Sequence, residues 1–242
     1  MTRLFLPAEM LSEEKIVITG EQARYLSLVL RIRPGNRLII FDGSTYKYIC
    51  KVLHVHKKEI TAVMVNKEPY TAESPLSITL AQGLPKSDRM DLIIQKSTEL
   101  GVKKIVPLIT GRSQVRHTAK TDRWRKIALA ASQQCGREKI TGIDDPVEFE
   151  KFLYNPPFPL FSGIIFSEEQ KEQNLKRILA GLKDVENIVL LIGPEGGFSE
   201  EETEAAVGKG FITASLGPRI LRTETAPLSA ISIIQYELGD MG

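Results

Sequence analysis

The feature that most constrains the fold is a short apolar run that ends in a glycine-rich turn. Residues 188–192 are apolar, and Gly193-Pro194-Glu195-Gly196-Gly197 follows them directly. A run of this kind, bounded by Gly-Pro, is typical of a fully buried parallel strand. Ser199 and Glu202 form a capping-box pattern, so a helix begins at this point. The order of strand, glycine turn and capped helix predicts bare backbone amides at the carboxyl edge of a parallel sheet, where open α/β folds bind ligands.

A second glycine turn follows in the same part of the chain. Residues 211–216 predict a strand that ends in Gly217-Pro218, and an apolar helix is predicted over 224–238. A single Gly-Pro-x-Gly-Gly sequence could equally be only a tight turn between a strand and a helix. Two glycine turns from adjacent strands, however, can face each other across a pocket. Neither the dinucleotide fingerprint nor a phosphate loop occurs, which argues against a nucleotide held by its phosphates.

Strands and helices alternate through the middle of the chain. Strands are predicted at 76–82, 104–109 and 160–166, and helices at 86–100 and 170–182. This βαβ alternation predicts a largely parallel sheet. Residues 144–155 are acidic and precede a proline-rich run, so we expect them to form an irregular loop.

The N-terminal part has a different pattern. Short strands are predicted at 3–6, 15–18, 37–41, 46–56 and 59–66, with one short helix at 21–30. Several short strands joined by tight turns indicate a compact barrel. A polar segment bracketed by prolines around residues 70–75 is typical of a linker. We therefore expect two domains, 1–72 and 73–242.

Charge is distributed unevenly along the chain. The formal net charge is only +2, but residues 86–140 hold 13 Lys and Arg against 5 acidic residues, and residues 1–70 hold 11 against 7. A basic N-terminal half favours a polyanion such as RNA, although a solvated surface with uneven charge explains it equally well. The candidate RNA-binding residues are Arg3, Arg24, Arg31, Arg33, Arg112, Arg116 and Arg219.

Other function classes find little support. No segment resembles a signal peptide or approaches the ~20 apolar residues that span a bilayer, so no membrane association is expected. Cys50 and Cys135 cannot build a disulfide framework, which fits a reducing compartment, and we expect a cytoplasmic protein. His54 and His56 have no further ligands at metal-site spacing, so no metal is expected.

The two glycine motifs resemble a known family. The first, Gly193-Pro194-Glu195-Gly196-Gly197, together with residues 216–226 (LGPRILRTETA), is similar to the RsmE family, the 16S ribosomal RNA uridine N3 methyltransferases of the SPOUT superfamily. The similarity extends to residues 83–86, 95–101 and 134–137 and covers essentially the whole chain. The sequence differs from the family pattern at Arg24-Tyr25, where histidines are usual, and at Gln133, where glutamate is usual.

The resemblance implies an α/β fold, a SPOUT (trefoil-knot) methyltransferase domain with a small N-terminal PUA-like β-barrel. It implies S-adenosyl-L-methionine as cofactor, 16S rRNA of the small ribosomal subunit as partner, and a homodimer. Catalytic candidates are Arg222, Glu195 and Glu224, and Glu168 is a further candidate beside the cofactor. Cofactor-binding candidates are Ser167, Leu191, Ile192, Gly193, Pro194, Glu195, Gly196, Gly197, Leu216, Gly217, Pro218, Ile220, Leu221, Thr225 and Ala226.

Two other interpretations remain open at this stage. The same fold could methylate transfer RNA or a ribose 2′-hydroxyl, which needs the same cofactor and another base pocket. A non-catalytic RNA-binding factor of ribosome assembly could keep the fold without the reaction. Cofactor binding separates this last class from the enzymes.

Overall fold

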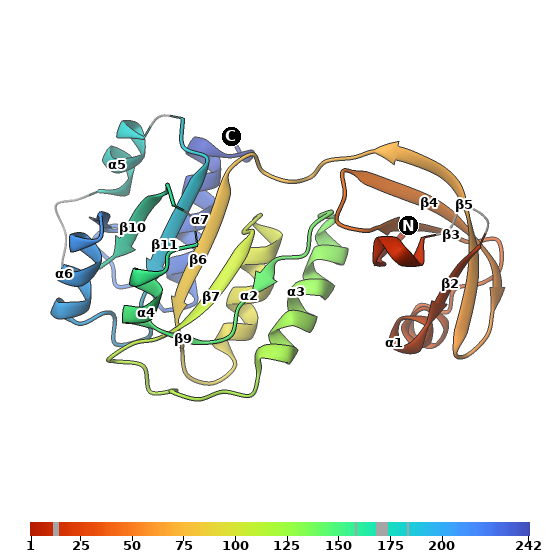
Figure 1. Cartoon of the computed structure of the whole chain (residues 1–242), viewed down its shortest axis with the longest axis horizontal. Coiled ribbons are helices and arrows are strands. Elements are labelled where there is room, and N and C mark those ends of the chain that lie inside the picture. The colour runs from red at the N-terminus through yellow and green to blue at the C-terminus, as the bar shows by residue number, and fades with distance from the viewer. Residues whose placement is uncertain (12–14, 158, 168–173, 183) are drawn as a thin grey trace. The chain divides into compact units, whose positions relative to one another are not determined.

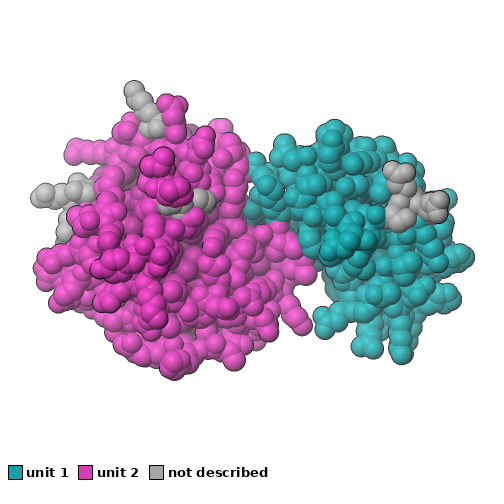
Figure 2. Space-filling model, in the orientation of Figure 1, with its two compact units in different colours: residues 1–73, 132–139 teal, residues 74–131, 140–242 magenta. Residues whose placement is uncertain are grey.

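The structure is a computed structural model of the chain and describes residues 1–11, 15–157, 159–167, 174–182 and 184–242 (Figure 1). The chain divides into two compact units, coloured separately in Figure 2. The first consists of Met1–Glu73 and Ser132–Lys139, and the second of Ser74–Ala131 and Ile140–Gly242. The assignment of Ser132–Lys139 to the first unit could not be read from the sequence, because the first four of these residues are the last turn of a helix that begins in the second unit.

The first unit is built on a five-stranded sheet. Its strands are β1 (Thr2–Phe5), β2 (Ile16–Thr19), β3 (Arg37–Phe41), β4 (Tyr46–Val55) and β5 (Glu59–Pro69), in the order β1-β3-β4-β5-β2. Only the β1–β3 pair is parallel. The register shifts twice between β4 and β5, and such irregularities bend and twist a long hairpin, as a small barrel requires.

A short helical segment covers this sheet. It begins as α1 (Gly20–Arg24), continues as a π-helix, η2 (Tyr25–Val29), and buries Leu26; a 3-10 turn, η1 (Ala8–Met10), precedes it. The core of the unit consists of alternate strand residues and the inner face of this segment. Its fully buried side chains include Leu4, Leu6, Ile16, Ile18, Leu26, Leu38, Ile40 and Ile60.

The second unit contains a seven-stranded parallel sheet, as the βαβ pattern predicts. The strands are β6 (Ser77–Gly83), β7 (Lys104–Ile109), β8 (Gly142–Ile143), β9 (Val147–Glu148), β10 (Ser162–Phe166), β11 (Asn187–Ile192) and β12 (Phe211–Ala214). Their order is β12-β10-β11-β6-β7-β8, and β9 also pairs with β7. The central β11 is buried along nearly its whole length, which explains its continuous apolar sequence.

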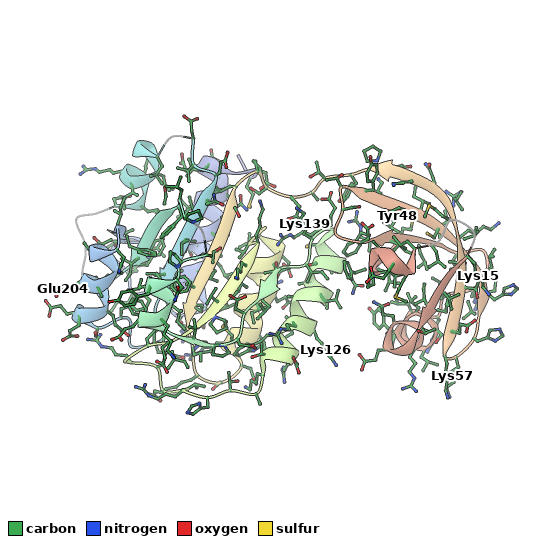
Figure 3. All side chains as sticks on the ribbon, viewed as in Figure 1. Lys15, Tyr48, Lys57, Lys126, Lys139 and Glu204 are labelled. Carbon is green, nitrogen blue, oxygen red and sulfur yellow. The ribbon has the colours of Figure 1, made fainter. Side chains whose placement is uncertain are left out.

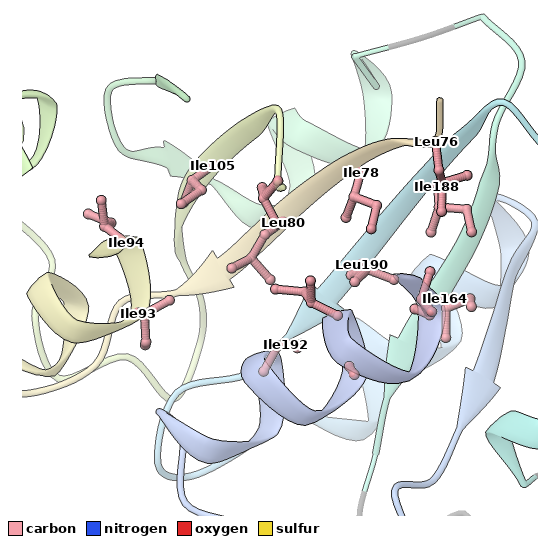
Figure 4. Close-up of a cluster of buried hydrophobic side chains, with 14 of the residues drawn as sticks. Leu76, Ile78, Leu80, Ile93, Ile94, Ile105, Ile164, Ile188, Leu190 and Ile192 are labelled. Carbon is pink, nitrogen blue, oxygen red and sulfur yellow. The ribbon is translucent and has the colours of Figure 1, made fainter. Parts of the chain in front are cut away.

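Helices cover both faces of the sheet. They are α2 (Arg89–Glu99), α3 (Thr121–Cys135), α4 (Phe149–Tyr154), α5 (Leu175–Gly181), α6 (Glu200–Gly208) and α7 (Thr225–Leu238). Leu190 and Ile192 of β11 belong to one core cluster, which includes residues of α2 and α7 (Figure 4). Leu191 points to the opposite face and joins a cluster with residues of α4 and α6. Because successive side chains of β11 point to opposite faces of the sheet, this strand contributes to the core on each face.

The second unit differs from the sequence-based prediction in the segment between β8 and β10. The prediction of an irregular loop over 144–155 is wrong, because β9 and α4 occupy part of it. Phe149, Phe152 and Leu153 lie on one buried face of α4, at helical spacing. This helix is short, follows an acidic segment and precedes prolines, which concealed its amphipathic pattern. Part of the helix predicted over 170–182 lies outside the described residues, and α5 forms its end.

A cavity at the carboxyl ends of three strands

A cavity of about 670 Å³ lies in the second unit, where the carboxyl ends of three strands meet. Phe166 and Ser167 after β10 line it, together with the glycine turn after β11 and the segment after β12. The prediction that the two motif strands are adjacent is wrong, because β10 lies between β11 and β12. Both turns nevertheless reach the same cavity, as expected for ligands at this edge of a parallel sheet.

Most of the predicted cofactor residues line this cavity. They are Ser167, Ile192, Gly193, Pro194, Glu195, Gly196, Gly197, Leu216, Gly217, Ile220, Leu221 and Ala226. Three predicted residues, Leu191, Pro218 and Thr225, are outside its lining. Leu191 is fully buried in the core cluster that includes residues of α4 and α6, whereas Thr225 is the exposed first residue of α7. Glu168 lies outside the described residues.

Part of the cavity lining is acidic and was not predicted from the sequence. Glu200, Thr203 and Glu204 of α6 line the cavity, and Glu204 is labelled in Figure 3. Glu200 and Glu204 are four residues apart, so they share one face of the helix. Ser199 caps α6 with the complete capping box that the sequence predicts: its hydroxyl accepts from the Glu202 N–H, and the Glu202 carboxylate accepts from the Ser199 N–H.

Gly193 and Gly217 show why the turns need glycine. A Cβ atom at Gly193 would lie 2.8 Å from the Gly197 Cα, so no side chain fits there. Gly217 has open space around it but a φ of +107°, a conformation that side chains disfavour. The turn after β11 therefore folds closely on itself, and it presents backbone to the cavity.

Two buried polar side chains hold the turns together. The Thr223 hydroxyl donates a hydrogen bond to the Gly193 carbonyl (3.1 Å), and the Gln82 amide donates to the same carbonyl (3.2 Å). The Gln82 amide also contacts the Gly83 carbonyl (3.0 Å) and the Thr223 hydroxyl (3.3 Å). Sequence reasoning missed both residues. The available signal was a glutamine inside an apolar strand, since buried polar groups are almost always hydrogen-bonded.

Arg89 is a further residue that the sequence did not indicate. This first residue of α2 lines the cavity and binds the Glu195 carboxylate through a short hydrogen-bonded ion pair. Glu195 also accepts from the Lys86 N–H (3.0 Å). The Arg89 Nε lies 3.5 Å from Glu224 Oε2, and this second contact is an ion pair without a hydrogen bond. Glu224 itself lies outside the cavity lining.

The pKa of Glu195 is lowered by this environment. Burial raises the pKa, but hydrogen bonds from backbone N–H groups, including that of Lys86, and from the Arg89 guanidinium outweigh this effect. Glu195 is therefore held as a carboxylate whose charge is already paired.

Arg219 and Arg222 also line the cavity and differ from Arg89. Both are exposed, and within the described residues neither guanidinium group has a hydrogen bond or an ion pair. Their guanidinium groups are available to a ligand at the cavity mouth. Arg112, predicted as an RNA contact, is exposed and also lines the cavity, where its NH1 donates to the Gly196 carbonyl (2.9 Å).

The remaining arginine candidates differ in their surroundings. Arg24, Arg31 and Arg33 are exposed in the first unit, where Arg31 has a φ of +51° two residues after the end of the π-helix. Arg116 is exposed in the second unit, with a long hydrogen bond to the Gly111 carbonyl (3.4 Å). Arg3 instead donates to the Gly136 carbonyl (2.6 Å) and to the Tyr70 hydroxyl, so it serves the internal structure of the first unit.

Two other features are absent from the described ranges. No group of three or more His, Cys, Asp or Glu side chains is arranged there to hold a metal ion. None of the helices in those ranges has the length and apolar character needed to cross a membrane.

The fold and the cavity agree with comparisons to known proteins. Residues 72–235 match the family model of the RNA methyltransferase domain, and residues 18–65 match that of the RNA methyltransferase PUA domain. The molecule therefore falls in the class of α/β RNA methyltransferases that carry a PUA domain. This is the predicted fold class, a SPOUT domain with an N-terminal PUA-like module.

The relatives define the family more closely. The ribosomal RNA small subunit methyltransferase E of Bacillus subtilis is 32% identical over 228 residues, which cover 91% of this chain and 89% of the relative. That of Buchnera aphidicola subsp. Schizaphis graminum is 32% identical and covers 99% and 97%. A crystal structure of the Neisseria gonorrhoeae protein bound to S-adenosyl methionine superposes with a TM-score of 0.91, at 35% identity and full coverage of both chains. This chain belongs to the ribosomal RNA small subunit methyltransferase E family.

Proposed function

We propose that the protein transfers a methyl group from S-adenosyl-L-methionine to N3 of a uridine in 16S ribosomal RNA. The observation that carries this proposal is the cavity at the ends of β10, β11 and β12, with two glycine turns on its walls and two unpaired arginines at its mouth. The family of the chain and its similarity to a relative crystallised with S-adenosyl methionine support the choice of cofactor.

The cavity residues fit this cofactor. A volume of about 670 Å³ is within the range of ~300–1,000 Å³ that is usual for small-molecule sites. The two turns that contain Gly193 and Gly217 would hold the nucleoside through backbone groups, as close approach without Cβ atoms allows. The carboxylates of Glu200 and Glu204 suit the cationic end of the cofactor.

S-adenosyl-L-methionine supplies an electrophilic methyl carbon bonded to a sulfonium leaving group. The protein then has two tasks, to align the uracil ring and to favour loss of the N3 proton. Arg222 and Arg219 suit the second task, because a guanidinium near the uracil oxygens stabilises the negative charge that develops there. Their lack of ion pairs within the described residues leaves both groups available for it.

The target base must be accessible. N3 lies on the Watson–Crick edge, so the uridine has to be unpaired or extruded from its stack. We propose that Arg24, Arg31 and Arg33 of the first unit bind RNA phosphates, since these side chains are exposed and Arg forms bidentate contacts with phosphate. Arg116 is a further candidate on the second unit, whereas the Arg3 guanidinium is engaged by the Gly136 carbonyl and the Tyr70 hydroxyl.

We further propose that the protein acts as a homodimer in the cytoplasm. Ile233 and Tyr236 of α7 are exposed at 40% and 63%, although the helix is otherwise strongly apolar. Exposed large apolar side chains on such a helix favour a contact with a second copy. Sedimentation analysis of the wild type and of Tyr236→Glu tests this, and a monomeric wild type would contradict it.

Primer extension tests the reaction itself. Purified protein and S-adenosyl-L-methionine are incubated with small subunits that lack the modification, and with naked 16S RNA. Because N3 methylation blocks base pairing, a cofactor-dependent stop at one uridine is expected. The absence of a stop, from a protein that binds the cofactor, would reject the proposed RNA or the proposed atom. The absence of cofactor binding would favour a non-catalytic assembly factor.

A further inference from the structure

Arg89 joins three elements around the cavity. Its backbone begins α2, its guanidinium binds Glu195 in the turn after β11, and its Nε faces Glu224 directly before α7. The side chain of Arg89 is 38% exposed, whereas those of Glu195 and Glu224 are 29% and 18% exposed. One partly shielded cation therefore lies between two carboxylates from segments that are far apart in the sequence.

Each carboxylate is attached to a different wall of the cavity. Glu195 follows Gly193 and Pro194 in the glycine turn, and Glu224 follows Thr223, which also lines the cavity. The Glu224 Oε2 atom is buried and has no hydrogen bond, so the positive charge of Arg89 is its nearest compensation in the described structure. Removing that cation would leave two neighbouring negative charges without compensation.

This arrangement disfavours a role for either glutamate as general base. Glu195 Oε1 already accepts hydrogen bonds from Arg89 and from the Lys86 N–H. Charge-assisted hydrogen bonds to one carboxylate oxygen stabilise the anion and so lower the basicity of the whole group. Glu224 lies outside the cavity lining. The lowered pKa of Glu195 points the same way, because it makes the carboxylate a weaker proton acceptor.

We propose that Arg89 is a positioning residue that fixes the two walls of the cofactor cavity through Glu195 and Glu224, and that both glutamates act as its anions rather than as proton acceptors. This inference rests on the proposed function for the identity of the ligand. Cofactor affinity then depends on Arg89 as well. Neither Glu195 nor Glu224 accepts the N3 proton.

A double-mutant cycle in cofactor binding tests the pairing. The variants are Arg89→Met, Glu195→Gln and the double variant, with S-adenosylhomocysteine as the calorimetric probe. Arg89→Met should weaken binding about tenfold, since misplaced walls cost affinity throughout the site. Because each single change removes the ion pair between Arg89 and Glu195, the double variant should bind no worse than Arg89→Met alone. Arg89→Lys, which keeps the charge, should recover part of the loss.

A matched control separates positioning from general destabilisation. Lys104 and Asp144 form an ion pair of 2.8 Å and similar exposure, and Lys104 lies at the amino end of β7, away from the carboxyl edge that holds the cavity. Lys104→Met should leave S-adenosylhomocysteine affinity unchanged. Wild-type affinity in Arg89→Met, or losses that add in the double variant, would overturn the proposal.

Turnover of Glu195→Gln at saturating cofactor supplies the second test. We expect it to remain within about tenfold of the wild type, whereas loss of a general base costs ~100-fold or more. A loss of that size would overturn the assignment of Glu195. If the wild type itself fails to methylate 16S RNA, the proposed function fails, and the binding cycle still decides the role of Arg89.

Discussion

The hydroxyl of Thr223 donates a hydrogen bond to the carbonyl of Gly193 over 3.1 Å, although the two residues are 30 positions apart. Thr223 is buried, and Gln82 at the end of β6 contacts both groups. The glycine turn after β11 and the segment before α7 are thus joined at one carbonyl. The shape of the cofactor cavity depends on this junction, because Gly193 and Thr223 both line it.

Replacing Thr223 with Val should loosen the junction. The change removes the hydroxyl and leaves the Gln82 amide as the remaining donor to Gly193. We expect a loss of about 1–2 kcal/mol in the free energy of unfolding, which is typical of a buried hydrogen bond. Urea denaturation measures it, and S-adenosylhomocysteine affinity should fall as well.

Thr223→Ser is the matched control for this variant. It keeps the hydroxyl and loses only a methyl group, so it should retain more of the affinity than Thr223→Val. Equal affinities in the two variants would show that the hydroxyl does not hold the turn.

Gly193→Ala should prevent cofactor binding. The new Cβ would lie 2.8 Å from the Gly197 Cα, so the backbone of the turn would have to move. Overpacking of this kind typically costs ~1–3 kcal/mol of stability, and here it displaces groups that face the cavity. Calorimetry with S-adenosylhomocysteine gives the affinity, and thermal unfolding gives the stability.

Gly208→Ala serves as the control for that substitution. Gly208 is the last residue of α6, and a Cβ there would meet no atom within 4 Å. The alanine should leave affinity unchanged and should not destabilise the protein, since Ala is favoured over Gly in helices. If Gly193→Ala behaved in the same way, close backbone packing of the turn would not govern binding.

Much of the second unit follows from local sequence signals. The apolar run before Gly193 predicts β11, and Ser199 with Glu202 predicts the start of α6, because both patterns depend on residues that are neighbours in the chain. The parallel sheet follows from the alternation of strands and helices. The predicted cofactor residues came from the glycine motifs and the family resemblance, and most of them line the cavity.

The sequence could not supply relationships that depend on topology. The position of β10 between β11 and β12 is set by pairing across the sheet, which no local pattern encodes. Arg89 and Glu195 meet only because α2 and the β11 turn converge in space. In the sequence, Arg112 is one of several cations in a basic run, and nothing nearby indicates its contact with Gly196 at the cavity wall.

Thiol labelling should distinguish the two cysteines. Cys50 is buried in the first unit, and burial raises the pKa of its thiol to about 12, so almost no thiolate exists near neutral pH. Cys135 is exposed at the end of α3. An alkylating reagent should therefore modify one thiol per folded chain, and a second only in denaturant.

Cys135→Ser provides the control for the labelling experiment. This variant should show no fast modification under native conditions and one modification after unfolding. Rapid native labelling of Cys135→Ser would mean that the sheet of the first unit opens readily around Cys50.

Arg222→Ala should lower turnover far more than cofactor affinity. Arg222 is exposed at the cavity mouth and has no ion pair within the described residues, so its loss leaves no buried partner without compensation. If its guanidinium stabilises charge on the uracil, removal should lower kcat by about 100-fold, as for other single groups that stabilise a transition state. S-adenosylhomocysteine binding should change less than about threefold, since this residue does not join the walls of the cavity.

Arg222→Lys and Arg219→Ala refine this test. Lysine keeps the charge but loses the planar fork, so partial activity in Arg222→Lys would indicate an electrostatic role rather than a bidentate one. If Arg219 shares the charge-stabilising role, Arg219→Ala should also lower kcat, whereas a rise in the KM for RNA alone would limit Arg219 to binding the substrate RNA. Parallel loss of affinity and turnover in Arg222→Ala would assign Arg222 to the cofactor site and would remove it from the proposed chemistry.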